Sequence, residues 1–120
     1  MSVPGKRVLL VDDNEDAREL LAGLLELQGY QIEAACDAPG ALEIAERFLP
    51  QVVVLDLGLP DVDGWELARR LRQLDGLAKV RIVALTGYGS ERDRERSREA
   101  GIDVHLLKPV EISQLTREFS

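Results

Sequence analysis

Residues 8–16 read VLLVDDNED, in which four apolar residues lead directly to two adjacent aspartates. The apolar run predicts a buried strand, so Asp12 and Asp13 stand at its carboxyl end. Two explanations account for like charges at this place. An aspartate is a good N-terminal cap for a following helix, or the two carboxylates serve a ligand at the edge of a sheet. What the other strands carry at their ends bears on this choice.

Short apolar runs alternate with segments of helical periodicity along the chain. We predict strands at Arg7–Val11, Gln31–Ala35, Gln51–Asp56, Val80–Leu85 and Val104–Leu107. We predict helices at Asn14–Gln28, Ala38–Phe48, Gly64–Leu74 and Ser90–Ala100, and from Glu111 to the end. This alternation predicts an α/β fold, in which residues 1–120 form a single doubly wound (βα)5 domain around a parallel sheet.

The composition excludes several classes of function. The 120 residues suffice for one domain with a hydrophobic core. A net charge of −7 argues against direct binding to nucleic acid, which needs a basic surface. The single cysteine, Cys36, excludes an internal disulfide and favours a reducing compartment. The chain has no signal-peptide pattern and no apolar run near the ~18 residues of a membrane helix. We therefore expect a cytoplasmic protein without membrane insertion.

Polar residues stand at the carboxyl ends of four predicted strands. Asp12 and Asp13 follow the first strand, Asp56 ends the third, Thr86 follows the fourth and Lys108 follows the fifth. Parallel strands bring these ends to one edge of the sheet, where the ligands of such folds bind. Two carboxylates ~4 Å apart repel by roughly 4 kcal/mol at an effective dielectric of 20. A bound Mg²⁺ accounts for such a cluster, because this cation prefers oxygen ligands.

These groups together predict phosphoryl transfer to a carboxylate. An aspartate can act as a nucleophile and form an aspartyl phosphate, and we assign that role to Asp56. Asp13 and Asp56 bind the metal, and Asp12 binds it directly or through a water molecule. Thr86 donates its hydroxyl group, and Lys108 pairs as a point charge with a phosphoryl oxygen.

The chain resembles the receiver domains of response regulators in two-component signalling, which are CheY-like phosphorelay proteins. The resemblance rests on VLLVDDNEDA, VVVLDLGLPDVDGWELARRLR, IVALTGYG and HLLKPV, which occur in this order and cover nearly the whole chain. It implies a flavodoxin-like, five-stranded sheet of order 2-1-3-4-5. It also implies Mg²⁺-dependent transfer of a phosphoryl group to Asp56 from a phosphohistidine, carried by a histidine kinase or a phosphotransfer domain.

The resemblance implies further roles. Gly58 offers its backbone carbonyl to the metal, and the Lys108–Pro109 peptide bond is commonly cis in the family. Phosphorylation switches the face formed by residues 80–107, and a homodimer can form through the helix at 90–100, the strand at 104–107 and the last helix. A receiver domain catalyses only its own phosphorylation and dephosphorylation, so we expect a signalling domain rather than an enzyme.

Some positions depart from the commonest form of the family. The switch residue, usually Tyr or Phe, is here His105, for which a partly exposed histidine without a switching role is the alternative. The variants DLGLPDVDGWE and LTGYG resemble receivers of hybrid histidine kinases. We therefore expect either a stand-alone receiver or one excised from such a kinase.

Two other classes of function compete with this interpretation. A haloacid-dehalogenase-like phosphatase also uses an aspartate nucleophile, Mg²⁺, Thr and Lys, but it needs a second aspartate two residues after the nucleophile. That position is Gly58. A pseudo-receiver that acts only as a binding surface would not need all five polar residues at the strand ends.

The predicted helix at Ser90–Ala100 reads SERDRERSREA and has only Ala100 as an apolar residue. Such a helix has almost no apolar stripe to bury. We predict that it is weakly docked on the sheet, either as part of a switching element or as an ordinary solvated surface helix.

Overall fold

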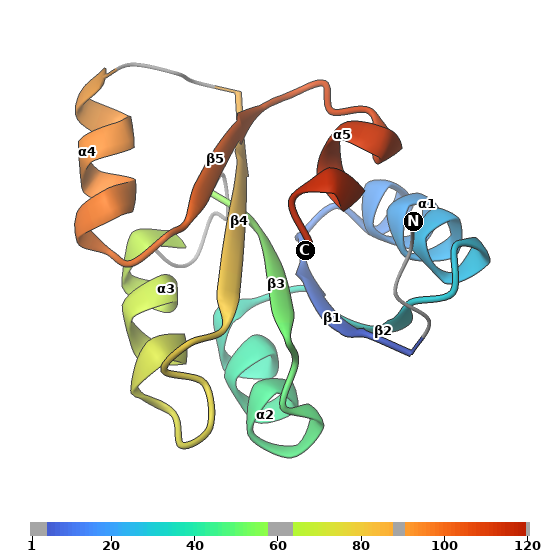
Figure 1. Cartoon of the computed structure of the whole chain (residues 1–120), viewed down its shortest axis with the longest axis horizontal. Helices are drawn as coiled ribbons and strands as arrows, with labels where there is room; N and C mark the ends of the chain where they lie inside the picture. The colour runs from blue at the N-terminus through green and yellow to red at the C-terminus, as the bar shows by residue number, and fades with distance from the viewer. Residues whose placement is uncertain (1–4, 58–63, 88–90, 120) are drawn as a thin grey trace.

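The computed structural model describes residues 5–57, 64–87 and 91–119, with residues 91–93 described by their backbone alone. Within these ranges five strands alternate with five helices (Figure 1). The strands are β1 (Arg7–Val11), β2 (Gln31–Ala35), β3 (Val52–Asp56), β4 (Arg81–Thr86) and β5 (Val104–Leu107). The helices are α1 (Glu15–Leu27), α2 (Ala38–Phe48), α3 (Gly64–Gln73), α4 (Glu91–Glu99) and α5 (Ile112–Arg117). The predicted alternation is confirmed. Element ends differ from the predicted ones by at most two residues, except that α5 ends at Arg117 and does not continue to the end of the chain.

All strand pairs are parallel, and the sheet has the order β2-β1-β3-β4-β5. This confirms both the doubly wound α/β fold and the strand order that the resemblance implied. After β1 the chain adds β2 on one side, and it then crosses back to add β3 on the other side. Ligands of such sheets bind where the strand order switches, which here is the edge at the ends of β1 and β3.

The central strands are apolar on both faces because helices cover both faces of the sheet (Figure 1). Leu9, Val53 and Ile82 face a core that contains buried residues of α2 and α3. Val8, Val52 and Val83 face a second core, which contains Leu25 of α1 and Leu115 of α5. Unbroken apolar runs in β1, β3 and β4 are the consequence, since each successive side chain enters one of the two cores.

The start of α1 shows which residue caps this helix. Asn14 is the N-cap of α1, and its side chain accepts a hydrogen bond from the backbone N–H of Ala17 at 2.9 Å. Asp12 and Asp13 therefore do not cap the helix. The helix was predicted to begin at Asn14, but Asn14 is the cap and the helix begins one residue later, at Glu15.

The end of the chain is held against the first strand and the fourth. Lys6 donates a hydrogen bond from Nζ to the carbonyl of Phe119, and Arg81 donates one from Nε to the carbonyl of Glu118. The Phe119 ring also meets Tyr30 edge to face, with 5.2 Å between the ring centroids. These contacts anchor the short helix α5 beside β1 and β4.

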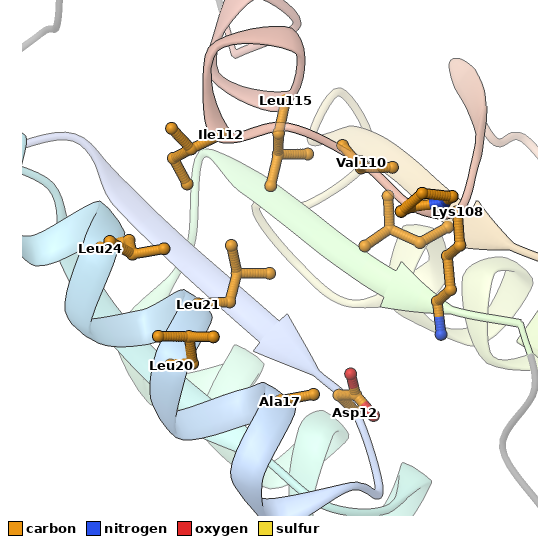
Figure 2. Close-up of a pocket in the computed structure, with 11 residues that line it drawn as sticks. Asp12, Ala17, Leu20, Leu21, Leu24, Lys108, Val110, Ile112 and Leu115 are labelled. Atoms are coloured by element: carbon orange, nitrogen blue, oxygen red, sulfur yellow. The ribbon is translucent and has the colours of Figure 1, made fainter.

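A groove of about 510 Å³ lies between α1 and the segment that leads from β5 into α5 (Figure 2). Leucine side chains of α1 line one wall, and Val110, Ile112 and Leu115 line the other. Asp12 and Lys108 stand at one end of the groove. The groove is therefore mostly apolar, with charged groups only where it reaches the edge of the sheet.

Candidate functional site

The pairing register of β1 and β3 brings the predicted acidic residues together. Val11 pairs with Leu55, so Asp12 and Asp56 are the next residues along two neighbouring strands. The backbone N–H of Asp12 donates to the carbonyl of Ala35 at 3.1 Å, which extends the pairing with β2 by one residue. Asp12 and Asp56 are thus positioned by the sheet itself.

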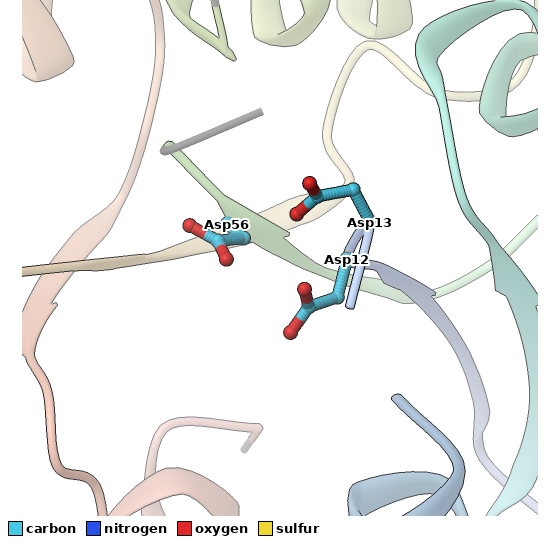
Figure 3. A group of neighbouring side chains, drawn as sticks. All are labelled: Asp12, Asp13 and Asp56. Carbon is cyan, nitrogen blue, oxygen red and sulfur yellow. The ribbon is translucent and has the colours of Figure 1, made fainter. Parts of the chain in front are cut away.

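Three carboxylates gather at this edge (Figure 3). One oxygen from each of Asp12, Asp13 and Asp56 lies within 4.8 Å of the other two. Asp12 is 6% exposed and Asp56 is 7% exposed, whereas Asp13 lies at the surface. At this separation each ionised pair repels by about 3 to 4 kcal/mol at an effective dielectric of 20, so folding alone does not favour the cluster.

Lys108 supplies the positive charge of the site from the loop after β5. Its Nζ donates to Oδ2 of Asp56 at 2.7 Å. Its backbone N–H donates to the carbonyl of Thr86 at 2.8 Å, and the Lys108–Pro109 peptide bond is cis. The hydrogen bond to Thr86 holds the loop at the end of β4, so the ammonium group reaches a carboxylate on the neighbouring strand.

The other predicted site residues lie on β4 and β5 or outside the described ranges. Thr86 is the last residue of β4, is 6% exposed and lies one residue beyond Leu85, the partner of Asp56 in the register. His105 is half-buried on β5 and pairs with Ala84. Gly58 lies outside the described residues. Strands β1, β3 and β4 therefore bring Asp12, Asp56 and Thr86 to one edge, as predicted from their places in the sequence.

Burial gives Asp12 an unusual protonation equilibrium. Removal from water raises the pKa of its carboxyl group above the ordinary value of 3.8, and the neighbouring charges of Asp56 and Asp13 act in the same direction. A hydrogen bond from the backbone of Asn14 and the charge of Lys108 act against them. The pKa of Asp12 is raised on balance, so the folded chain disfavours the ionised form of this residue.

The donor set matches a hard divalent cation. All three side chains offer carboxylate oxygens, and opposite ligands of an octahedral Mg²⁺ are about 4.2 Å apart, since Mg²⁺–oxygen distances are 2.0–2.1 Å. The observed span of 4.8 Å is slightly wider than this separation. It fits a site in which two carboxylates bind directly and a third acts through a water molecule. The raised pKa of Asp12 also favours a cation at this site, because a bound cation would stabilise the ionised carboxylate.

Two residues that the sequence analysis did not predict, Asn14 and Arg18, donate hydrogen bonds to Asp12. The backbone N–H of Asn14 donates to Oδ1 of Asp12 at 3.0 Å, and Nη1 of Arg18 donates to the carbonyl oxygen of Asp12 at 2.9 Å. Arg18 lies in the first turns of α1, at a spacing from Asp12 that lets a long side chain reach back to the strand end. That spacing was the available signal, but a lone arginine on a helix usually indicates only a solvated surface.

Comparison with known proteins identifies the family. The family model for the response regulator receiver domain matches residues 8–120. The chain is 31% identical to the polar-differentiation response regulator DivK of Brucella anthropi, over 89% of this chain and 87% of that protein. It superposes on the chemotaxis protein CheY4 of Vibrio cholerae with a TM-score of 0.90 at 26% identity, covering 94% of each chain.

A second similar structure is the receiver domain of the sensor histidine kinase PA1611 from Pseudomonas aeruginosa PAO1, which has a magnesium ion coordinated in its active-site cleft. The TM-score is 0.86 and the identity 31%, over 96% of this chain and 94% of that one. The chain therefore belongs to the family of response-regulator receiver domains, the signalling domains of two-component systems. In the described part of the chain, no helix has the length and apolar character needed to cross a membrane.

Proposed function

We propose that residues 1–120 form one phosphoacceptor domain, which takes a phosphoryl group from a phosphohistidine onto Asp56. One observation carries the proposal: Asp56 is buried at a sheet edge between two further carboxylates and an ammonium group 2.7 Å away. Acidic residues on one side suit a cation, and Lys108 on the other suits a phosphoryl oxygen. The receiver family is the class of protein in which this combination is expected.

In the proposed reaction, a carboxylate oxygen of Asp56 attacks phosphorus and forms the new P–O bond. The P–N bond of the donor histidine breaks, and the imidazole nitrogen leaves with the electron pair. Lys108 then transfers its hydrogen bond from the carboxylate to a phosphoryl oxygen, and Thr86 donates its hydroxyl group to another. Positioned donors of this kind stabilise the charge that the transferred group carries.

Asp13 and Asp56 are the residues proposed to hold Mg²⁺, with Asp12 bound directly or through water and Gly58 offering its backbone carbonyl. A bound Mg²⁺ would neutralise phosphoryl oxygens and reduce repulsion between the incoming group and the carboxylates. The magnesium ion of the Pseudomonas aeruginosa receiver supports this assignment, since that domain is 31% identical to this chain.

The phosphodonor is proposed to be a histidine kinase or a phosphotransfer domain that docks in the groove between α1 and α5. The donor histidine must reach Asp56, so its protein must cover the surface that surrounds the site. Leu20 and Leu24 of α1 are 66% and 39% exposed beside the groove, which ends at Asp12 and Lys108. The first turns of α1 carry Glu15, Asp16 and Glu19, so a partner with apolar residues flanked by basic ones fits this surface.

The remaining expectations are part of the same proposal. The domain acts in the cytoplasm, does not bind nucleic acid directly, and is either a stand-alone receiver or part of a hybrid histidine kinase. Phosphorylation switches the face that β4, α4 and β5 form, with Thr86 and His105 as switch residues, and a homodimer can form through α4, β5 and α5. Membership of the receiver family gives no support to the alternative of a haloacid-dehalogenase-like phosphatase.

Labelling by a small phosphodonor tests the proposal. The chain is incubated with acetyl phosphate and Mg²⁺ and analysed by intact mass. We expect one added phosphoryl group in the wild type and none in Asp56→Asn. The matched control is Asp75→Asn, which removes an exposed carboxylate beyond the other end of α3 and should leave labelling unchanged. Labelling of Asp56→Asn at the wild-type level would assign the chemistry to another residue.

A further inference from the structure

Helix α4 is held on the molecule by a polar contact with the single tryptophan of the chain. Among its described side chains, at residues 94–99, Ser97 alone is buried, with 2% exposure. The Ser97 hydroxyl oxygen accepts a hydrogen bond from Nε1 of Trp65 at 3.0 Å. The Arg96 guanidinium carbon lies 4.0 Å from the centre of the same ring. The helix that the sequence predicts to be weakly docked therefore has a specific partner on α3.

Trp65 is positioned by residues that lie directly beside the phosphoacceptor. The preceding residue, Gly64, begins α3 against the end of β3. A Cβ atom added at Gly64 would lie 2.7 Å from the Leu57 side chain and 3.2 Å from the Leu57 Cα. Leu57 follows Asp56 in the chain. The absence of a side chain at Gly64 thus lets the first turn of α3 lie in close contact with the residue next to Asp56.

These contacts form a continuous connection from Asp56 through Leu57 and Gly64 to Trp65, and from the indole to α4. We propose that this connection, the indole link, transmits phosphorylation of Asp56 to α4. The proposal rests on the proposed function, because it takes Asp56 as the acceptor. It adds a route that leaves β3 through α3, separate from the residues Thr86 and His105 on β4 and β5.

The chemistry of the link suits a switching element. A phosphoryl group adds bulk and about −1.5 to −2 charges to the end of β3 at neutral pH. Tight contact between Leu57 and the start of α3 leaves little room to absorb a shift there, so the shift passes to Trp65. The hydrogen bond to Ser97 depends steeply on distance and angle. The described side chains of α4, at residues 94–99, include no apolar residue that would hold the helix in place once that bond is altered.

Hydrogen exchange in α4 tests the link in wild type, Trp65→Phe and Ser97→Ala. Phenylalanine retains an aromatic ring but has no N–H, and alanine removes the acceptor, so each variant breaks the same hydrogen bond from a different side. Exchange at residues 94–99 is measured with Mg²⁺, in the presence and absence of excess acetyl phosphate. Intact mass is recorded on the same samples to measure phosphorylation.

We expect acetyl phosphate to change exchange in α4 of the wild type by at least threefold. In both variants phosphorylation should reach the wild-type level, while the change in α4 falls to less than half of the wild-type change. A merely structural clamp would speed exchange equally with and without acetyl phosphate and would preserve the change. Preservation of the change in either variant overturns the link.

A matched pair of arginine variants tests the stacking contact. Arg96→Gln and Arg94→Gln each remove one exposed charge from α4, but only the first removes the cation over the ring. Because Trp65 is the sole tryptophan, its fluorescence reports on the link directly. Acetyl phosphate with Mg²⁺ should change the emission of the wild type and of Arg94→Gln, and the change should be at least halved in Arg96→Gln.

The outcomes separate this inference from the proposed function. A wild type that takes up no phosphoryl group contradicts the proposed function and removes the basis of the link. A wild type that is phosphorylated on Asp56 without any change in Trp65 emission or in α4 exchange contradicts the link alone. Asp56→Asn should show neither labelling nor a change in emission.

Discussion

Asp12 is placed where its ionised form is unfavourable, and this determines how the residue contributes to stability. It is 6% exposed, near two other carboxylates, and its pKa is raised. A carboxyl group with a raised pKa in the folded state binds its proton more tightly there than in the unfolded chain. Its contribution to the free energy of unfolding is therefore greatest at low pH and is lost as the pH rises from 3.8 through the raised value.

Asp12→Asn should stabilise the chain in the absence of divalent cations, because it removes a buried charge and keeps an oxygen that can accept the hydrogen bond from Asn14. We expect a gain on the order of 1 kcal/mol at pH 7. The difference from wild type should be small near pH 3.8 and grow with pH. Urea unfolding in the presence of EDTA, followed from pH 3.5 to 7.5, measures it. A constant difference at all pH values would show that the charge of Asp12 is not its cause.

The positions of the acidic residues follow from the sequence, but their supporting contacts do not. Asp12, Asp13 and Asp56 stand at the ends of apolar runs, and parallel strands end at one edge whatever their exact register. The cap at Asn14 and the reach of Arg18 depend instead on how the backbone turns between β1 and α1. Composition and periodicity carry no information about that turn.

At the scale of elements, the contacts of α4 cannot be predicted from the periodicity of apolar residues. The period of apolar residues predicts the other helices, because each buries a face on the sheet. Helix α4 is held by Ser97 and Arg96, two polar residues that pattern analysis assigns to solvent, and their partner Trp65 lies in another helix. A polar contact between residues 32 positions apart leaves no periodic signal in either segment.

Helix α4 should still be among the less protected elements. Its described side chains bury little apart from Ser97, whereas α1 buries Leu25 and packs Leu21 and Ala22 against the core. We expect amides of residues 94–99 to exchange faster than those of residues 16–27 in the unphosphorylated chain, because local opening exposes less apolar surface. Hydrogen exchange resolved by residue measures both. Equal protection would mean that the contact with Trp65 holds α4 as firmly as a core helix.

The short helix α5 should depend strongly on Phe119. This side chain is 2% exposed, belongs to the core beneath α1 and α5, and meets Tyr30 edge to face. Phe119→Ala should lower the free energy of unfolding by about 3 to 5 kcal/mol, as expected for a buried aromatic residue. Urea unfolding with a two-state fit measures the loss.

The matched control for Phe119 is Leu27→Ala at the end of α1. Leu27 is 85% exposed, so its truncation creates no cavity and should change stability by no more than about 0.5 kcal/mol. A similar loss in both variants would indicate that Phe119 is not packed in the core in solution.

At the scale of the whole molecule, the order of the strands assembles the site. Residues 12, 56, 86 and 108 are far apart in the chain. Parallel strands bring them to one edge of the sheet, and the order β2-β1-β3-β4-β5 makes the ends of β1, β3, β4 and β5 successive neighbours along it. Alternating strands and helices predict a parallel sheet, but they do not set its order. The resemblance to receiver domains predicts this order, and the pairing register of β1 and β3 places Asp12 beside Asp56.

Mg²⁺ should stabilise the whole domain, because the three carboxylates converge only in the folded chain. A ligand that binds the native state alone adds RT ln(1 + [L]/Kd), which is about 2.7 kcal/mol at one hundred times Kd. That gain raises the melting temperature of a domain of this size by roughly 11 °C, at about 4 °C per kcal/mol. Thermal unfolding with EDTA and with 10-fold steps of MgCl₂, at constant ionic strength, measures the shift.

Asp13→Asn should remove most of the shift in melting temperature. The control Asp75→Asn removes a charge that lies beyond the other end of α3, and it should retain the shift. Equal melting temperatures with and without Mg²⁺ in the wild type would rule out the proposed metal site, because a cation that relieves the repulsion among Asp12, Asp13 and Asp56 must favour the only state in which they meet.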